Sequence, residues 1–236
     1  MNDRYGLPLS TGSAQAAQAY QRAADRLLAA GADLVGGFDA ALAIDPGFAL
    51  AQIGRARCLA TYGRASEART SANHARELVQ GATRRERGHV EALALSVEGR
   101  GAEALAAIRE HLVEFPRDAL VLHPATGIFG LMGFSGRLER EAELLAMLDA
   151  LAPHYGEDWW FASARAFAAC ECGRLDEAQM LIERSMAANP RNAHGAHIMS
   201  HVLYEGGELE AGHRYLEGWM PAYEREGLMH CHLSWH

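Results

Sequence analysis

The sequence predicts an all-α protein built from repeated pairs of helices, because two sequence marks, a Gly motif and a Pro, recur with the same period. A Gly that precedes an Arg or Glu and then a Glu-Ala step recurs five times, with spacings of 36, 37, 37 and 34 residues, at Gly63, Gly99, Gly136, Gly173 and Gly207. A second mark is a Pro, spaced by 70, 37 and 37 residues, at Pro46, Pro116, Pro153 and Pro190. The spacing of 70 is about two periods, and a fixed period of this size is typical of stacked repeats.

Each mark has a physical meaning within one repeat. Gly ends the first helix of a pair, since it adopts the left-handed conformation without a Cβ penalty. The Glu-Ala step opens the second helix, where an acid suits the positive end of the helix dipole. Pro then ends that helix. A pair within about 34–37 residues has tetratricopeptide spacing, which predicts a right-handed superhelix whose first helices line the concave face.

Reading these marks along the chain predicts the helices and the domain organisation. We expect the first 13 residues to form an N-terminal arm and residues 14–236 to form one continuous solenoid. The helices are expected at 14–30, 34–44, 48–62, 65–79, 84–98, 101–114, 118–134, 138–151, 156–172, 175–188, 192–205, 208–225 and from 228 onward. The run Arg84-Arg85-Glu86-Arg87 is interpreted as a solvated helix face.

Composition excludes several classes of function. All 22 basic residues are Arg, which excludes a Schiff-base lysine and a Walker-type phosphate loop. A net charge of −8 argues against nucleic acid as a partner. The sequence shows neither a signal peptide nor an apolar run long enough for a membrane span. Its four Cys are therefore expected to be reduced thiols in the cytoplasm.

Histidines are concentrated near the end of the sequence, where seven of the 12 lie between positions 194 and 236. His197 and His201 form a His-x3-His pair, and His232 and His236 form another, 35 residues later. Each pair shares one helical face. Because 35 residues is one repeat, the two pairs should lie on neighbouring first helices, about 8–10 Å apart. Four imidazoles are therefore expected to converge on the concave side.

The same register extends towards the N-terminus. Seven residues beyond successive prolines stand His123, Trp160 and His197, and His232 falls near the same line. The predicted groove is therefore lined by His123, Trp160, His197, His201, His232, Trp235 and His236. Polar rings beside aromatic side chains in a concave surface suit a peptide, protein or small-molecule ligand.

Three interpretations of these residues remain open at the level of sequence. The rings can be structural packing groups, they can line a ligand groove, or His197, His201, His232 and His236 can hold a divalent transition metal such as Zn²⁺, with or without catalysis. Neither pair is His-Glu-x-x-His, so the usual metalloprotease base is missing. The candidate carboxylates are Glu157, Asp158 and Glu205, and no spacing forces them into the site.

The chain resembles the tetratricopeptide repeat protein 38 family over essentially its whole length. The resemblance is carried by Gly6-Leu-Pro-Leu-Ser-Thr11 with the helix that contains Ala17 and Tyr20, by Phe115-Pro-Arg-Asp118 leading to His123, by Asn192-Ala-His-Gly-Ala-His197 with His201-Val-Leu, and by Cys231-His-Leu-Ser-Trp235-His236. Ordinary tetratricopeptide repeats lack the His-x3-His201-Val element and the His232…Trp-His236 element. The resemblance implies a cytosolic helical repeat protein and assigns it no biochemical activity.

Members of that family continue beyond the Trp-His element with further repeats. The resemblance therefore implies either that the natural chain extends past His236 or that a second protomer covers the last helix. Solenoids normally end in a capping repeat with a polar outer face. For the second case we expect a homodimer through the last repeat, driven by burial of Leu228, Met229, Leu233 and Trp235.

Overall fold

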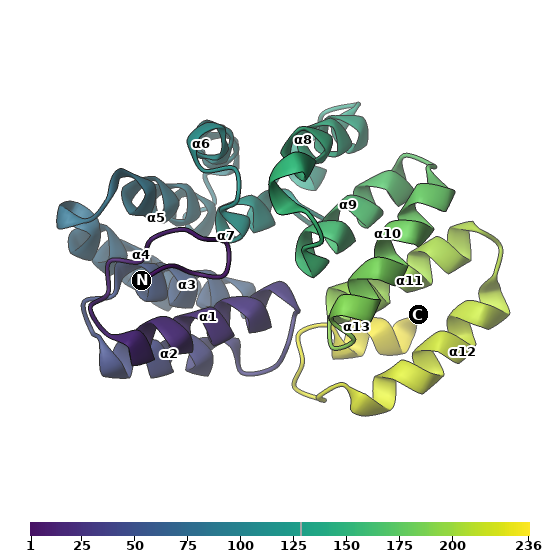
Figure 1. Ribbon diagram of the computed structural model, residues 1–236, viewed down its shortest axis with the longest axis horizontal. Helices are drawn as coiled ribbons and strands as arrows, with labels where there is room; N and C mark the ends of the chain where they lie inside the picture. Colours follow the sequence, from purple (N-terminus) through teal and green to yellow (C-terminus); the bar gives the residue numbers. More distant parts are fainter. Residues whose placement is uncertain (128) are drawn as a thin grey trace. The chain divides into compact units, whose positions relative to one another are not determined.

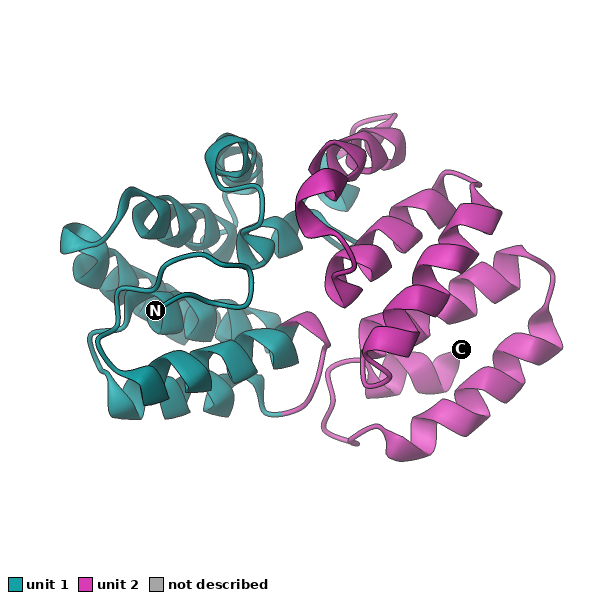
Figure 2. Ribbon diagram, in the orientation of Figure 1, with its two compact units in different colours: residues 1–27, 33–135 teal, residues 28–32, 136–236 magenta. Residues whose placement is uncertain are grey.

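The computed structural model describes residues 1–127 and 129–236, and in these residues the protein is all-α (Figure 1). Helices follow one another along the described chain, and the only β-type pairing there is an isolated bridge between Asn2 and Pro8. The predicted all-α class is therefore confirmed. The helices fall into two compact units, which Figure 2 colours separately.

Unit 1 comprises residues 1–27 and 33–135. Its helices are α1 (Ala14–Leu28, whose last residue falls in unit 2), α2 (Leu34–Ile44), α3 (Ala49–Thr61), α4 (Ala65–Leu78), α5 (Arg84–Val97), α6 (Gly101–Glu114) and α7 (Ala119–Leu122), with 3₁₀ turns at Val79–Gly81, His123–Ala125 and Gly133–Ser135. Unit 2 comprises residues 28–32 and 136–236. Its helices are α8 (Arg140–Tyr155), α9 (Trp159–Glu171), α10 (Leu175–Ala188), α11 (Ala193–Glu205), α12 (Leu209–Trp219) and α13 (His230–Trp235), with a 3₁₀ turn at Met220–Ala222.

Within each unit, the packing of helices follows the repeat. The two helices of a pair contact each other in four cases, namely α3 with α4, α5 with α6, α9 with α10 and α11 with α12. First helices of successive pairs also contact each other, α3 with α5 in unit 1 and α9 with α11 in unit 2. The pattern read from the two sequence marks thus corresponds to real neighbours in space.

The repeated glycines have the conformation that the sequence predicts. Gly63, Gly99, Gly136, Gly173 and Gly207 all have φ between +71° and +79°. Four of these glycines lie just beyond the end of the first helix of a pair. Gly136 instead follows the 3₁₀ turn at Gly133–Ser135. A side chain at any of these positions would be strained, because L-residues rarely adopt this conformation.

The expected helix at 118–134 is wrong. Helix α7 ends at Leu122, and the chain continues as a 3₁₀ turn over His123–Ala125. Pro124 lacks an amide proton and its ring opposes the carbonyl of the preceding turn, so it disfavours continuation of the α-helix. Gly127 then adopts φ +78°, which turns the chain away from a helical path. Residue 128, which the expected helix also covered, lies outside the described residues.

At Pro153 the expected end of a helix is also wrong, but here the helix is longer than predicted rather than shorter. Helix α8 instead passes through Pro153 and ends at Tyr155. Tyr155 is buried and stacks on Phe161, with 4.1 Å between ring centroids and 9° between ring planes. Burial of this aromatic pair favours one more turn over a stop at the proline. The helix expected at 208–225 is shorter, since α12 ends at Trp219.

The first 13 residues are attached to unit 1 rather than free of it. Tyr5 and Leu9 are buried. The Ser10 amide donates a hydrogen bond to Glu86 Oε1 at 2.8 Å, and the Thr11 hydroxyl donates to Asp45 Oδ2 at 2.5 Å. Glu86 is only 1% exposed, and Arg85 beside it is 3% exposed. The solvated face predicted for this run is therefore wrong at both residues, because the N-terminal segment covers them.

Candidate metal centre

Two helices of unit 2 supply the four histidines of the predicted site. His197 and His201 lie one turn apart on α11, His232 lies on α13, and His236 follows its last residue. Helix α11 begins where the Ala193 amide donates to the Ala29 carbonyl at 3.0 Å. Helix α13 has only six residues and carries Leu233, which is buried against Ala193 and Leu216 among others. This apolar anchor holds the second His pair beside the first.

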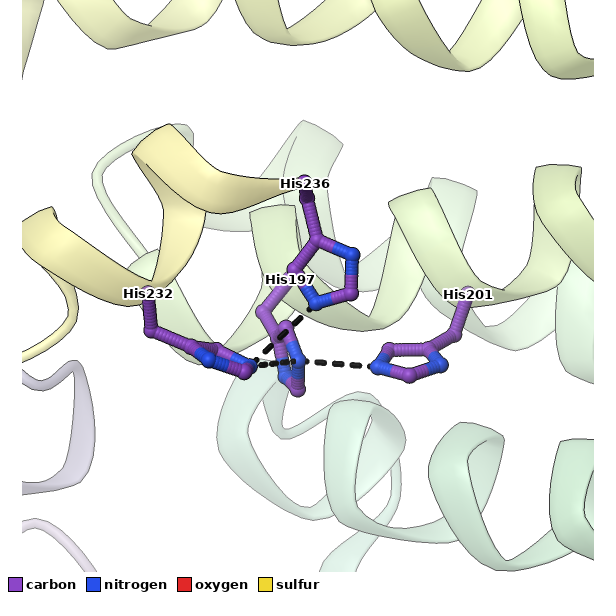
Figure 3. Close-up of side chains that lie close together, drawn as sticks. All are labelled: His197, His201, His232 and His236. Carbon is purple, nitrogen blue, oxygen red and sulfur yellow. Dashed lines mark hydrogen bonds between the residues drawn. The ribbon is translucent and has the colours of Figure 1, made fainter.

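The four imidazoles converge on one point (Figure 3). The Nε2 atom of His197 lies 2.9 Å from Nε2 of His201 and 2.8 Å from Nε2 of His232. Nε2 of His236 lies 3.2 Å from Nε2 of His232. One ring nitrogen from each of the four lies within 4.8 Å of the other three. The structure thus brings together the four residues that the sequence proposes as metal ligands.

Hydrogen bonding among the rings does not account for this arrangement. A neutral imidazole Nε2 carries either one proton or one lone pair. The three contacts form a chain from His201 through His197 and His232 to His236. His197 and His232 are the inner members of this chain, and each Nε2 there has two contacts. If donors and acceptors alternate, one of these two nitrogens must accept two hydrogen bonds with a single lone pair. The other must donate its single proton to two acceptors. At most two contacts are ordinary hydrogen bonds, whereas a cation at the centre would engage all four lone pairs.

The spacing also suits a transition metal. Zn–N bonds of about 2.0–2.1 Å in a tetrahedron place the ligand nitrogens about 3.3–3.4 Å apart. The three Nε2 contacts of 2.8, 2.9 and 3.2 Å differ from that edge by a few tenths of an ångström. All six separations lie within 4.8 Å, so the more distant nitrogens would also have to move inwards around an ion.

Electrostatics favours neutral rings in this cluster. Burial, followed by the nearby His201, His232 and His236, lowers the pKa of His197 to about 2. Burial and His232 lower the pKa of His201 against a small opposing effect of Glu205, and burial followed by His201 and His232 lowers the pKa of His236. Neutral imidazoles are the form that binds a metal.

Aromatic side chains flank the cluster on two sides. Phe167 on α9 meets the His201 ring edge-on, with 6.1 Å between centroids. Trp235 lies nearly parallel to His232 at 6.3 Å and meets His236 at 5.3 Å. Trp235 is 79% exposed, so one side of the cluster is bounded by an indole that solvent reaches.

The other residues proposed for the groove are placed elsewhere. Trp160 is 2% exposed and packs beside Tyr155, so it is a core residue of unit 2. His123 belongs to unit 1, in the turn after α7, and is not a member of the four-histidine group. Among the candidate carboxylates, Glu157 pairs with Arg184 at 3.2 Å and Asp158 accepts the Phe161 amide at the start of α9. Glu205 is exposed and outside the group.

Sequence reasoning missed a second histidine cluster, which lies in unit 1 around Asp118. This carboxylate accepts from Arg85 Nε at 2.8 Å, from His111 Nε2 at 2.9 Å and from His89 Nδ1 at 3.0 Å. All four side chains are buried. Arg85 and His89 lie one turn apart on α5, which was a readable signal, but Asp118 reaches them from outside that helix. Asp118 pairs with Arg85 and with one ring nitrogen of each histidine, so we interpret this cluster as a structural network, in which Nε2 of His89 is buried without a hydrogen-bond partner.

No protein-family model matches this sequence. In the described residues no helix is long and apolar enough to cross a membrane. Fold and site together define the class as an all-helical protein with a four-histidine cluster.

Proposed function

We propose that the protein binds a divalent transition-metal ion through His197, His201, His232 and His236. The observation that carries the proposal is the convergence of four imidazole nitrogens within 4.8 Å of one another. Two further features support it. Hydrogen bonds cannot satisfy all the contacts, and the group contains no carboxylate or ammonium that could take the place of an ion.

The donor set selects the class of ion. Four imidazoles suit Zn²⁺, Cu²⁺, Ni²⁺ or Co²⁺, whereas Mg²⁺, Ca²⁺ and Mn²⁺ prefer carboxylate, carbonyl and water oxygens. Zn²⁺ is the ion we expect, because four protein nitrogens around one point match its tetrahedral preference.

The wider setting of the site is also part of the proposal. The periodic glycines, the helix pairs and the contacts between first helices support a right-handed tetratricopeptide-type superhelix related to the tetratricopeptide repeat protein 38 family. The four Cys are free thiols in the structure, which supports a reducing compartment such as the cytoplasm. Peptide binding in a continuous groove has less support, since Trp160 is a core residue.

Elemental analysis of the purified protein tests the proposal. We expect about one equivalent of Zn²⁺ per chain after dialysis, and none after chelation. His197→Ala should lower the affinity by more than the 10–100-fold that loss of an outer-sphere partner costs, because it removes a ligand itself. His213→Ala is the matched control, since His213 lies on α12, is exposed and pairs with Glu217. Equal metal content in the parent and His197→Ala proteins contradicts the proposal.

A further inference from the structure

The four histidines are not equivalent in their burial. His197 is 8% exposed, His201 and His232 are half-buried, and His236 is exposed. The order of burial therefore runs from His197 at the inside to His236 at the solvent side. An ion at the centre would have three sheltered imidazoles and one that solvent reaches directly.

The elements that carry the four histidines differ in how firmly they pack, and the order is the same as the order of burial. His197 and His201 stand on a helix of 13 residues that contacts both α9 and α12. His232 stands beside Leu233, which is 2% exposed and anchored in the apolar cluster of unit 2. His236 lies outside the six-residue helix α13, and the two residues before it, Ser234 and Trp235, are exposed. Its nitrogen also makes the longest of the three Nε2 contacts, at 3.2 Å.

We propose that His236 is an exchangeable ligand, and that a small carboxylate can take its place on the metal. This inference rests on the proposed function, since it needs a bound ion. Zinc sites with three protein ligands keep the fourth position for water or substrate, whereas sites with four fixed ligands are closed. Here His197, His201 and His232 are the fixed set, and the solvent-side position becomes open whenever the His236 ring swings away.

Trp235 narrows the class of ligand. Its ring lies beside both His232 and His236 and is 79% exposed, so a molecule that replaces the His236 ring arrives next to the indole. An anionic oxygen would bind the ion, and a flat apolar body would pack on Trp235. No acidic side chain belongs to the cluster, so its charge does not oppose an incoming carboxylate. The favoured ligand is therefore an aromatic or other apolar carboxylate.

Cobalt substitution makes the exchange visible. Co²⁺ replaces Zn²⁺ in nitrogen sites, and its visible absorption reports the ligands that it has. Azide, acetate and benzoate are titrated into the Co²⁺-loaded parent protein. We expect the spectrum to change with saturation for each anion. Benzoate should bind about 2- to 12-fold more tightly than acetate, the factor that an aromatic contact contributes.

Two variants separate the roles of the two residues. His236→Ala removes the competing imidazole, so the affinity for all three anions should rise by about tenfold or more while Co²⁺ remains bound. Trp235→Ala should abolish the preference for benzoate and leave azide binding unchanged. His213→Ala should behave as the parent does.

The outcomes distinguish the two proposals. A parent protein that takes up no Co²⁺ or Zn²⁺ contradicts the metal-binding function itself. A parent that takes up one equivalent of Co²⁺ but whose spectrum none of the anions changes is a closed structural centre, which overturns the exchange and leaves metal binding intact. Anion binding with no difference between benzoate and acetate removes the role of Trp235. The titration of the parent needs no variant to fold.

Discussion

Both units of the protein bury histidines, but the two sets have different partners. In unit 1, His89 and His111 meet the carboxylate of Asp118, together with Arg85. In unit 2, the ring nitrogens of four histidines contact one another, with no carboxylate in the group. The same side chain therefore occupies a paired environment in one unit and an unpaired one in the other.

A carboxylate partner is what separates a structural histidine from a candidate metal ligand in this protein. A carboxylate accepts a ring N–H and balances nearby positive charge, so the network around Asp118 is charge-balanced without any added group, although Nε2 of His89 has no hydrogen-bond partner. The four rings of unit 2 have no acceptor of that kind, and one nitrogen of each ring lies within 4.8 Å of the other three. The metal ion proposed above would complete the second arrangement. The whole set around Asp118 is buried, whereas only His197 is buried in the second set, and the presence of a carboxylate is the chemical difference between them.

The largest change in stability should come from removing the charge of Asp118 at the centre of the unit 1 network. Asp118→Asn leaves the buried Arg85 with only its longer ion pair to Asp3, at 3.6 Å, which should lower the free energy of unfolding by about 3–5 kcal/mol. Urea denaturation measures the loss. The matched control is Asp39→Asn, which removes the carboxylate that pairs with Arg55 on the surface and should cost less than about 1 kcal/mol. Similar losses in the two variants would show that burial adds nothing to the Asp118 network.

Metal should give the next largest effect, and only through the second cluster. Zn²⁺ at about 100 times its Kd should stabilise the parent by about 2.7 kcal/mol, because it binds the folded state alone. His201→Ala should gain nothing from Zn²⁺ and, without metal, should stay within about 1 kcal/mol of the parent, since its ring is half-buried. Thermal unfolding with Zn²⁺ and with chelator measures both quantities. A metal-free His201→Ala protein that fails to fold would identify these rings as packing groups.

Low pH should produce a smaller loss of folding stability, through the Asp118 network of unit 1. Burial lowers the pKa of His89 below 6.5, against the opposing effect of Asp118. Burial alone would raise the pKa of Asp118, but His89 and Arg85 outweigh it and hold that pKa well below 3.8. Both groups bind fewer protons when folded than when unfolded. Stability is therefore complete above pH 6.5, falls first through His89 as the pH drops below that value, and falls further through Asp118 below 3.8.

The magnitude of the acid effect can be bounded. One group contributes at most about 1.4 kcal/mol per pH unit, so His89 accounts for about 2 kcal/mol at most between pH 6.5 and pH 5. Urea midpoints at a series of pH values measure the slope. His89→Gln, whose side chain donates to Asp118 without titrating, should flatten the slope in this range. An unchanged slope in that variant would assign the effect to other groups.

Several features were predictable from the sequence because they depend on local chemistry. The five repeated glycines could be assigned to helix ends, since the left-handed conformation is a property of the residue itself. The pairing of His197 with His201, and of His232 with His236, follows from the helical period. The offset of 35 residues added the expectation that the two pairs meet, because neighbouring repeats stack.

Other features depended on what lies across from a residue. Pro124 and Pro153 are chemically alike, yet the α-helix stops before the first and continues through the second, where Tyr155 gains a stacking partner in Phe161. Arg85 and Glu86 read as surface charges and are buried beneath the N-terminal segment. Trp160 keeps the register of the predicted groove but points into the core.

The sequence by itself therefore determined the helical repeat and the two histidine pairs, because short-range periodicity sets both. Tertiary structure alone decided which histidines have a carboxylate. Asp118 lies 29 residues from His89 and joins it only through packing, whereas no acidic side chain joins the four histidines of unit 2. A hydrogen-bond partner supplied by another helix leaves no local trace in sequence, since its choice depends on distances that only the folded chain defines.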